Sequence, residues 1–203
     1  MRCMAVVLKI AAAGEQPELC VRPWLAVDMP ELLAAMNHER PKGGPLSHRP
    51  SGLGPRNEEE AVRCLSGQEH GWAAGDWLTF AVLDTPRNRV VGHIGLMNRD
   101  GGQVGIGGPG EIGYWTAVDA RGCGIAPAAV RAVTRWAFSR FGAKGLPRIM
   151  LVHDVDNAAS CRVAVKSGYP FREFSPANPP YWFTDGHIHL AEANSVELVT
   201  GDG

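Results

Sequence analysis

Clusters of apolar residues separated by turn-forming residues predict several β-strands along the chain. The stretches WLTFAVLD (77–84) and RVVGHIGLMNR (89–99) flank the turn TPRN, a pattern typical of a β-hairpin. A second hairpin is predicted close to the C-terminus. The remaining strands are predicted over 18–23, 111–118 and 148–154, and the C-terminal hairpin over 172–175 and 181–195.

Other segments follow helical patterns. Leu32, Leu33 and Met36 form an apolar stripe in a helix predicted over 28–40, which begins at the capping residue Asp28. A helix over 57–75 begins at Asn57, with acidic residues in its first turn. Two more helices are predicted, one within 120–138 and one over 157–168. This order predicts an α+β fold: one central, mostly antiparallel sheet of about six to seven strands, with helices on both faces.

The chain is expected to form a single domain over residues 1–203, with its core over 16–195. Four prolines and four glycines in 41–56 exclude regular structure there, so this stretch is predicted to be a long loop, either functional or disordered. The ends, 1–14 and 196–203, are expected to be flexible.

The amino-acid composition limits the classes of function that this protein can have. The chain is 45% apolar and 20% charged, as globular proteins are, and its net charge of −1 gives no support for a nucleic-acid partner. Its five cysteines form no CxxC pair, which argues against a zinc site or a disulfide framework and fits a reducing cytoplasm. We find no apolar run long enough to span a membrane, and Lys9 interrupts the apolar N-terminal stretch that faintly resembles a signal peptide. We therefore expect a cytoplasmic protein without a membrane partner.

A glycine-rich turn, RGCGIA (121–126), leads directly into a predicted helix. Gly122 and Gly124 have no Cβ, so the backbone can approach an anion closely, and the helix N-terminus offers unpaired N–H groups. The P-loop pattern is not met, because no Lys–Ser/Thr pair follows Gly122. A dinucleotide-binding turn is not met either, since Pro127 stands where its third glycine is required.

The surrounding motifs carry a resemblance to a known family. EIGYWTAVDARGCGIAPAAVRAVTRWAF (111–138) resembles the coenzyme A-binding motif of the GNAT superfamily of N-acetyltransferases, and DNAASCRVAVKSGY (156–169) resembles its second motif. Both are most similar to the branch of ribosomal-protein N-terminal (Rim-type) acetyltransferases. The resemblance implies a GNAT-like sheet that is splayed where the coenzyme binds, with acetyl-CoA as cosubstrate and no metal.

The resemblance also implies which residues bind the cosubstrate. The backbone of 115–118 would pair with the pantetheine arm, and an N–H near Ala117 or Val118 would polarise the thioester carbonyl. The N–H groups of 123–126 would hold the pyrophosphate, and the Asn157 amide would hold the arm, although Asn157 is equally suited to cap its helix. The expected cofactor-binding residues are Trp115, Thr116, Ala117, Val118, Arg121, Gly122, Cys123, Gly124, Ile125, Ala126 and Asn157.

Two residues are predicted to be catalytic. In many members of the superfamily a tyrosine on the second-motif helix protonates the departing thiolate, but Ala164 occupies that position here. In the branch that the chain resembles, the serine of N-x-x-S faces the coenzyme sulfur. The resemblance therefore implies that Ser160, one turn earlier on the same helix face, is the proton donor or hydrogen-bond partner of the thiolate. Glu111 is the first choice for the base that takes a proton from the amine, directly or through a water. His93 and His153 are left open as alternatives.

The sequence says less about the amine acceptor than about the acyl donor. An N-terminal α-amine has a lower pKa, near 8, than a lysine at about 10.4, and so gives up its proton more readily at neutral pH. A protein or peptide N-terminus is therefore expected, with small amines, or a non-catalytic acyl-CoA sensor, as alternatives; a homodimer is also left open. Asp185, His187 and His189 alternate on a predicted strand in a spacing that fits a metal, but the family implies none.

Overall fold

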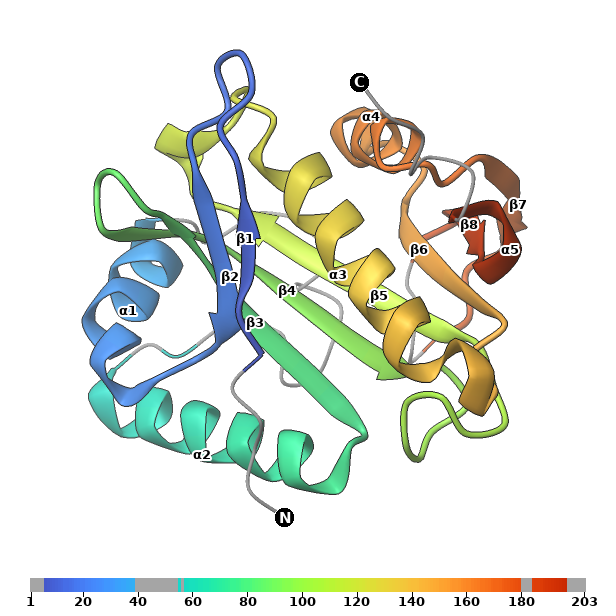
Figure 1. The fold of residues 1–203 in the computed structure, drawn as a ribbon, viewed down its shortest axis with the longest axis horizontal. Coiled ribbons are helices and arrows are strands. Elements are labelled where there is room, and N and C mark those ends of the chain that lie inside the picture. Colours follow the sequence, from blue (N-terminus) through green and yellow to red (C-terminus); the bar gives the residue numbers. More distant parts are fainter. Residues whose placement is uncertain (1–5, 39–54, 56, 180–183, 197–203) are drawn as a thin grey trace.

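The computed structural model describes residues 6–38, 55, 57–179 and 184–196, and most of the predicted loop over 41–56 lies outside them. The described residues contain an eight-stranded sheet and the helices around it (Figure 1). The strands are β1 (Leu8–Ile10), β2 (Leu19–Pro23), β3 (Trp77–Asp84), β4 (Arg89–Asn98), β5 (Gly110–Thr116), β6 (Arg148–Asp154), β7 (Phe171–Ser175) and β8 (Gly186–Glu192). The α-helices are α1 (Met29–His38), α2 (Glu58–Ala74), α3 (Ile125–Phe141), α4 (Ala158–Lys166) and α5 (Ala193–Val196); short 3-10 turns are η1 (Ala26–Asp28), η2 (Val118–Ala120) and η3 (Gly142–Lys144).

The sheet has the order β1-β2-β3-β4-β5-β6-β8-β7. Its neighbouring strands are antiparallel except for β5 and β6, which run parallel. The prediction of a mostly antiparallel α+β fold is therefore confirmed, with one strand more than expected. The additional strand, β1, lies within the end that we expected to be flexible. Its three residues pair with β2, and so short a segment becomes recognisable only through its partner.

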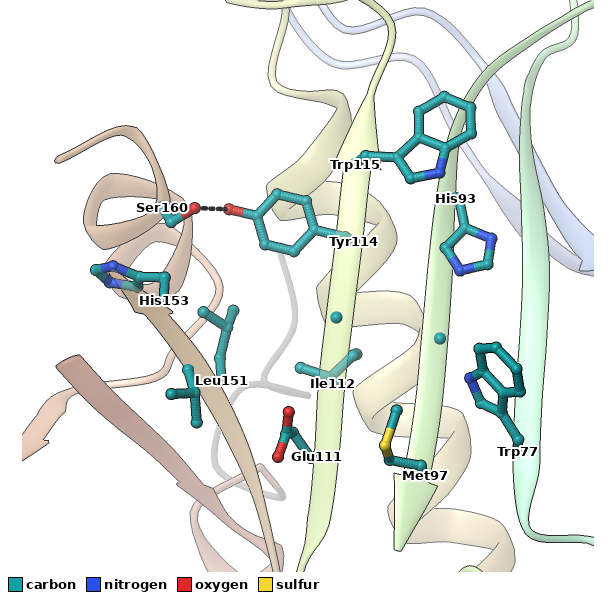
Figure 2. Close-up of a pocket in the computed structure, with 13 residues that line it drawn as sticks. Trp77, His93, Met97, Glu111, Ile112, Tyr114, Trp115, Leu151, His153 and Ser160 are labelled. Carbon is teal, nitrogen blue, oxygen red and sulfur yellow. Dashed lines mark hydrogen bonds between the residues drawn. The ribbon is translucent and has the colours of Figure 1, made fainter. Parts of the chain in front are cut away.

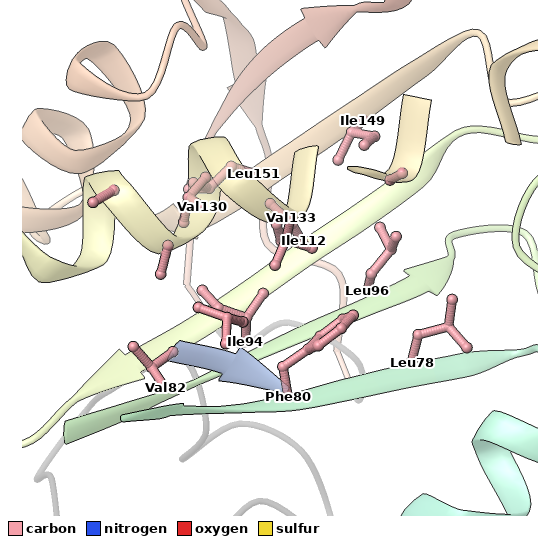
Figure 3. Packing of buried hydrophobic residues seen from close by; sticks show 14 of the residues in the cluster. Leu78, Phe80, Val82, Ile94, Leu96, Ile112, Val130, Val133, Ile149 and Leu151 are labelled. Carbon is pink, nitrogen blue, oxygen red and sulfur yellow. The ribbon is translucent and has the colours of Figure 1, made fainter. Parts of the chain in front are cut away.

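Apolar side chains pack on both faces of the sheet. On one face, Phe80, Ile94 and Ile112 from three adjacent strands belong to one buried cluster with Val130 and Val133 of α3 (Figure 3). These α3 residues lie three apart, as a helix requires for a buried stripe. On the other face a second cluster joins the sheet to α1 and α2; it contains Trp24, Leu32, Leu65, Ala81 and Val90. The helices thus hold the central strands from both sides, as the sequence predicted.

The parallel pair β5–β6 opens part-way along its length. It is in register only at Gly110–Ile149, Glu111–Met150 and Ile112–Leu151, although β5 continues to Thr116 and β6 to Asp154. Beyond that point β6 pairs with β8 alone. The two strands therefore diverge, and the sheet is splayed in the middle as predicted.

Two glycines of α2 give a paired test of how closely this helix packs on the sheet. A Cβ on Gly71 would lie 2.5 Å from the Trp77 carbonyl oxygen, whereas on Gly67 it meets no described atom within 4 Å. Gly71→Ala is therefore expected to lower the free energy of unfolding by about 1–3 kcal/mol through overpacking. Gly67→Ala should raise it by about 0.5–1 kcal/mol, because alanine favours a helix. Urea denaturation of both variants measures this, and equal effects would contradict the packing.

Candidate active site

A pocket lies where β5 and β6 diverge, and several predicted residues meet there (Figure 2). Residues from both faces of β5 line the pocket, because side chains from either face reach the gap between β5 and β6. Ser160 enters from α4, and Trp77 from β3 forms the opposite wall. The pocket is lined by Trp77, His93, Gly95, Met97, Glu111, Ile112, Gly113, Tyr114, Trp115, Leu151, Val152, His153 and Ser160.

The splayed edge of β5 offers backbone groups that its neighbours do not use. The Ala117 N–H donates to the carbonyl oxygen of Val91 in β4 over 2.9 Å, so it already pairs with that strand. Because antiparallel pairing alternates, Trp115 also directs its N–H and C=O groups to β4, while Tyr114 and Thr116 direct theirs to the gap. This N–H is therefore already bonded, and the expected role of an N–H near Ala117 or Val118 on the thioester carbonyl stays a prediction. Tyr114, which the sequence-based set omitted, presents its backbone groups to the gap, whereas Trp115 presents its own to β4.

The predicted strand over 111–118 is also shorter than expected. It ends at Thr116, and Val118 begins the 3-10 turn η2. The Arg121 Nε donates to the Thr116 carbonyl oxygen over 3.2 Å, which ties the glycine-rich turn back to the end of β5. This contact places the turn next to the gap.

The two glycines of the glycine-rich turn adopt a backbone conformation that other residues rarely adopt. Gly122 and Gly124 have φ angles of 83° and 74°, in the left-handed region that favours glycine. Gly124 is the N-cap of α3, both glycines are exposed, and Ile125 is buried and anchors the first turn. Cys123 is half-buried, with its Sγ 3.6 Å from the Arg121 carbonyl oxygen. An exposed turn with a helix N-terminus behind it is suited to an anion such as a diphosphate.

Ser160 has a partner that the sequence did not reveal. Its side chain is 7% exposed, and its Oγ accepts a hydrogen bond from the Tyr114 hydroxyl over 3.0 Å (Figure 2). Burial raises the pKa of Tyr114, so the hydroxyl keeps its proton at neutral pH. Because Ser160 accepts this bond, its own proton is available to a group in the pocket. Ala164, where many relatives carry a tyrosine, is completely buried in the core.

Asn157 acts as a helix cap. Its Oδ1 accepts a hydrogen bond from the Ser160 N–H over 3.0 Å at the start of α4. The cap orients the first turn, which carries Ser160 toward the pocket. The second expected role of Asn157, binding the pantetheine arm, stays a prediction.

Glu111 lies at the other end of the pocket and is not a solvated strand-end residue. It is 9% exposed, and its carboxylate forms an ion pair with Arg99, which follows β4. Arg99 was not among the predicted site residues, because the pair depends on the register of β4 with β5. The ion pair holds the carboxylate beside the pocket. Its role as a base stays a prediction.

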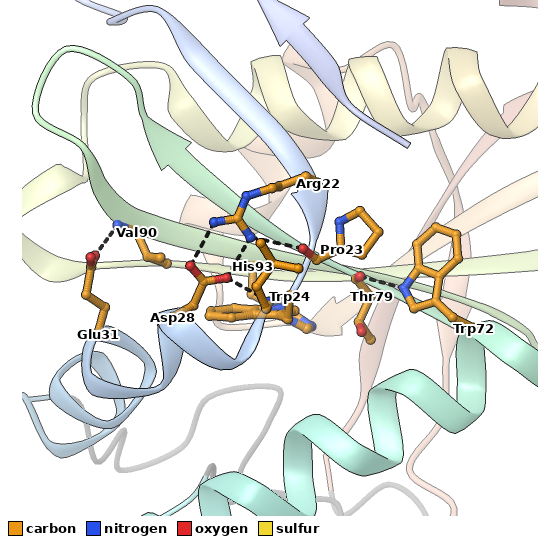
Figure 4. Close-up of polar contacts among 10 residues, drawn as sticks. Arg22, Pro23, Trp24, Asp28, Glu31, Trp72, Thr79, Val90 and His93 are labelled. Atoms are coloured by element: carbon orange, nitrogen blue, oxygen red, sulfur yellow. Dashed lines mark hydrogen bonds and ion pairs between the residues drawn. The ribbon is translucent and has the colours of Figure 1, made fainter. Parts of the chain in front are cut away.

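The wall around His93 is fixed by a chain of polar contacts (Figure 4). Arg22 forms an ion pair with Asp28 over 2.6 Å, so Asp28, expected to cap α1, instead braces the segment between β2 and that helix. Trp24 in this segment donates its Nε1–H to the His93 Nδ1 over 3.0 Å. His93 also stacks on Trp115, with ring centroids 6.1 Å apart. The tryptophan can only donate, so the neutral imidazole carries its proton on Nε2.

Burial lowers the pKa of His93 to about 4. This makes the imidazole a poor base at neutral pH and weakens the alternative that assigned it this role. His153 also lines the pocket, but it belongs to a separate group of side chains described below.

The lowered pKa of His93 predicts a loss of stability in acid. The unfolded chain takes up the proton near pH 6.5 and the native chain only near pH 4, so the free energy of unfolding falls as the pH drops between these values. One such group contributes at most about 1.4 kcal/mol per pH unit. His93→Asn, which offers Trp24 an oxygen acceptor, should show a flatter decline in urea denaturation from pH 7.5 to 4.5. Identical slopes in the two proteins would contradict the assignment.

The aromatic residues expected near the acceptor have different positions. Trp77 lines the pocket and is 40% exposed. Trp72 packs edge-on against Phe80 in the core, and its Nε1–H donates to the Thr79 carbonyl oxygen over 2.9 Å. Residues 181–183 lie outside the described part of the chain. Of the described helices, none is long and apolar enough to cross a bilayer.

Comparison with solved structures shows the same fold in acetyltransferases. Mycobacterium smegmatis RimJ in complex with CoA-disulfide is 20% identical, covers 98% of this chain and 90% of its own, and has a TM-score of 0.70. RimL, a ribosomal L7/L12 alpha-N-protein acetyltransferase in complex with coenzyme A, is 16% identical, with 92% and 98% coverage and a TM-score of 0.72. The microcin C7 self-immunity acetyltransferase MccE, in complex with acetyl-CoA and AMP, is 15% identical, with 91% and 98% coverage and a TM-score of 0.70.

Comparison of the sequence with family models agrees. The model described as "Acetyltransferase (GNAT) domain" matches residues 18–170, most of the chain, including both motifs and every strand around the pocket. No curated protein matches. Because the match extends over more than half of the sequence, the chain belongs to the GNAT acetyltransferase family.

Proposed function

We propose that this acetyltransferase transfers the acetyl group of acetyl-CoA to the N-terminal α-amine of a protein or peptide, by direct attack within a ternary complex. The observation that carries the proposal is the hydrogen-bonded pair of Tyr114 and Ser160 hydroxyls beside the splayed edge of β5. The exposed turn of Gly122 and Gly124 follows the end of the same strand. The coenzyme A complexes of RimJ, RimL and MccE support this choice of donor.

The glycine-rich turn and the splayed edge of β5 would bind different parts of acetyl-CoA. The N–H groups at the start of α3 would hold the diphosphate, aided by the positive end of the helix dipole. The backbone groups of Tyr114 and Thr116, which face the gap, would pair with the amides of the pantetheine arm. The thioester would then lie between β5 and α4, within reach of Ser160.

The chemistry moves one proton from the amine and one to sulfur. The neutral amine attacks the thioester carbonyl carbon, the C–N bond forms, and the C–S bond breaks to release the thiolate. Ser160 gives its hydroxyl proton, or a strong hydrogen bond, to that thiolate while the Tyr114 hydroxyl stabilises the serine oxygen. Glu111, directly or through a water, takes the proton that leaves the amine.

The pocket favours an amine that is easily deprotonated. His93 has a pKa of about 4 and the Glu111 carboxylate is engaged by Arg99, so neither group is matched to an amine with the pKa of lysine, about 10.4. An N-terminal α-amine, with a pKa near 8, is partly neutral at physiological pH and needs less assistance. The names of RimJ and RimL, the second an alpha-N-protein acetyltransferase, agree with this acceptor class.

An amine panel tests the proposal. The protein is incubated with acetyl-CoA and, separately, with a lysine-free peptide with a free N-terminus, an N-terminally blocked peptide with one lysine, and a polyamine. Thiol release is followed, and mass spectrometry locates the acetyl group. We expect release with the free N-terminus. Release only with the blocked peptide or the polyamine would overturn the acceptor class, and coenzyme binding without any release would indicate a sensor.

A further inference from the structure

Four side chains of types that ligate metals converge beside the pocket, next to Ser160. His153 lies on β6, Cys161 on α4, and His187 and His189 on β8. One ligand atom from each lies within 4.8 Å of all the others. Ring contacts link the three imidazoles, with the His153 centroid 5.4 Å from that of His187 and 5.2 Å from that of His189.

The sheet register explains why the histidines meet. His153 is the direct cross-strand partner of His187, so their side chains share a face, and His189 lies two residues further along the same face. Cys161 approaches this face from α4, with its Sγ 3.3 Å from the His187 Nδ1 and 3.7 Å from the His189 Nε2. Zinc–ligand bonds of about 2.0–2.1 Å to nitrogen and 2.3 Å to sulfur imply ligand atoms roughly 3.3–3.6 Å apart on a tetrahedron. The two distances from the Cys161 Sγ lie close to that range, and all four ligand atoms lie within 4.8 Å of one another.

The second nitrogens of the rings are oriented as in metal sites. The His153 Nδ1 lies 2.8 Å from the Asp154 carbonyl oxygen, and the His189 Nδ1 lies 3.1 Å from the Tyr169 carbonyl oxygen. A carbonyl oxygen only accepts, so both Nδ1 atoms carry the proton and both Nε2 atoms keep a lone pair. Such backbone contacts fix the ring orientation of metal-ligating histidines.

The lone pair of His153 is buried and has no partner. The side chain is 1% exposed, and among the described residues its Nε2 finds no hydrogen bond. An unpaired buried polar atom costs free energy, so its position inside a group of ligands needs an explanation.

We propose that His153, Cys161, His187 and His189 form a binding site for a divalent transition-metal cation, with Zn²⁺ as the ion that suits three imidazoles and one thiolate best. Four protein ligands would close the coordination sphere, so the site is structural rather than catalytic. The bound ion would link α4 to β6 and β8 next to Ser160. Because His153 would then be a metal ligand, it would no longer be an alternative for the catalytic base.

This ligand set differs from the one considered from the sequence. The Asp185 Oδ1 instead accepts a hydrogen bond from the Ala177 N–H over 2.8 Å. His153 and Cys161, distant in sequence from β8, take its place. The proposal therefore replaces our expectation of a protein without a metal, and it does not depend on the acceptor or on acetyl transfer.

Cobalt titration tests the site directly. Metal-stripped protein is titrated with Co²⁺, and the thiolate-to-cobalt charge-transfer and tetrahedral d–d bands are recorded. We expect one Co²⁺ per chain, displaced by one Zn²⁺. Cys161→Ala and His187→Ala should weaken Co²⁺ binding by about 100-fold or more. Cys20→Ala, a change of another half-buried thiol, should leave it unaltered. Wild-type protein without these bands, or equal spectra in all the variants, would overturn the proposal.

A second measurement uses only the wild-type chain and so does not depend on how the variants fold. Alkylation of each thiol is followed by mass spectrometry with and without Zn²⁺. The metal should slow modification of Cys161 at least tenfold and leave Cys20, Cys64 and Cys123 unchanged. Equal rates at Cys161 with and without Zn²⁺ would count against the site.

Discussion

Replacing Ser160 by alanine is expected to lower kcat about 100-fold while the affinity for coenzyme A stays the same. The change removes the hydroxyl that receives the Tyr114 bond and leaves the departing thiolate without a donor. General acid catalysis contributes roughly 10²–10⁴-fold to rates of this kind, so the lower end of that range is a conservative expectation. Steady-state kinetics with the best amine of the panel, together with calorimetry of coenzyme A binding, separate the two effects.

Ser167 supplies the matched control. It lies at the C-terminal end of the same helix, is likewise 7% exposed, and its Oγ donates to the Pro127 carbonyl oxygen rather than to a pocket residue. Ser167→Ala should therefore keep the wild-type kcat. Tyr114→Phe should reduce kcat less than Ser160→Ala, since the serine proton remains. If Ser160→Ala retained its turnover, or Ser167→Ala lost as much, the assignment of Ser160 would fail.

Gly122→Val is expected to raise the Kd for coenzyme A about 100-fold. Gly122 has a φ of 83°, a conformation that a β-branched residue rarely adopts, so the turn must rearrange and its N–H groups must rotate away from the diphosphate. A hydrogen bond to a charged group contributes about 1.5–3 kcal/mol, so the loss of one or two such bonds accounts for a change of this size. Calorimetry with coenzyme A, and with its 3′-dephospho form, measures the loss.

Gly101 offers a control with the same backbone constraint. Its φ is 86°, and neither it nor Gly122 has a described atom within 4 Å of an added Cβ. Gly101→Val should therefore destabilise the protein by a similar amount, about 1–3 kcal/mol, and leave coenzyme A affinity unchanged. Equal losses of coenzyme A affinity in Gly122→Val and Gly101→Val would mean that backbone strain explains the result, and not the loss of N–H groups that bind the diphosphate.

The features that the sequence predicted well are local ones. The start of α3 behind the glycine-rich turn and the cap of α4 at Asn157 each depend on a few consecutive residues. Backbone conformation over such a span follows from the residues themselves, through missing Cβ atoms and capping side chains. The order of strands and helices was read in the same way. It missed β1, with its three residues, and the short helix α5, where the predicted strand over 181–195 ends early at Glu192.

The contacts that complete the site depend on tertiary structure. Tyr114 and Ser160 are 46 positions apart and meet only because β5 and β6 diverge beneath α4. The sequence did place Tyr114 on a predicted strand, but it did not show which backbone groups β4 would occupy. Pairing register decided that, and it turned the N–H of Ala117 away from the gap.

The sequence by itself therefore determined the glycine-rich turn at the start of α3, the α+β plan and the presence of a serine on the second-motif helix, because short-range sterics and hydrogen bonding control these features. Only the tertiary structure decided which side chains face one another across the sheet. It paired Tyr114 with Ser160 and Arg99 with Glu111, and it brought His153 and Cys161 to the histidines of β8. Such meetings follow from strand order and register, which arise from the packing of the whole core and not from any one segment.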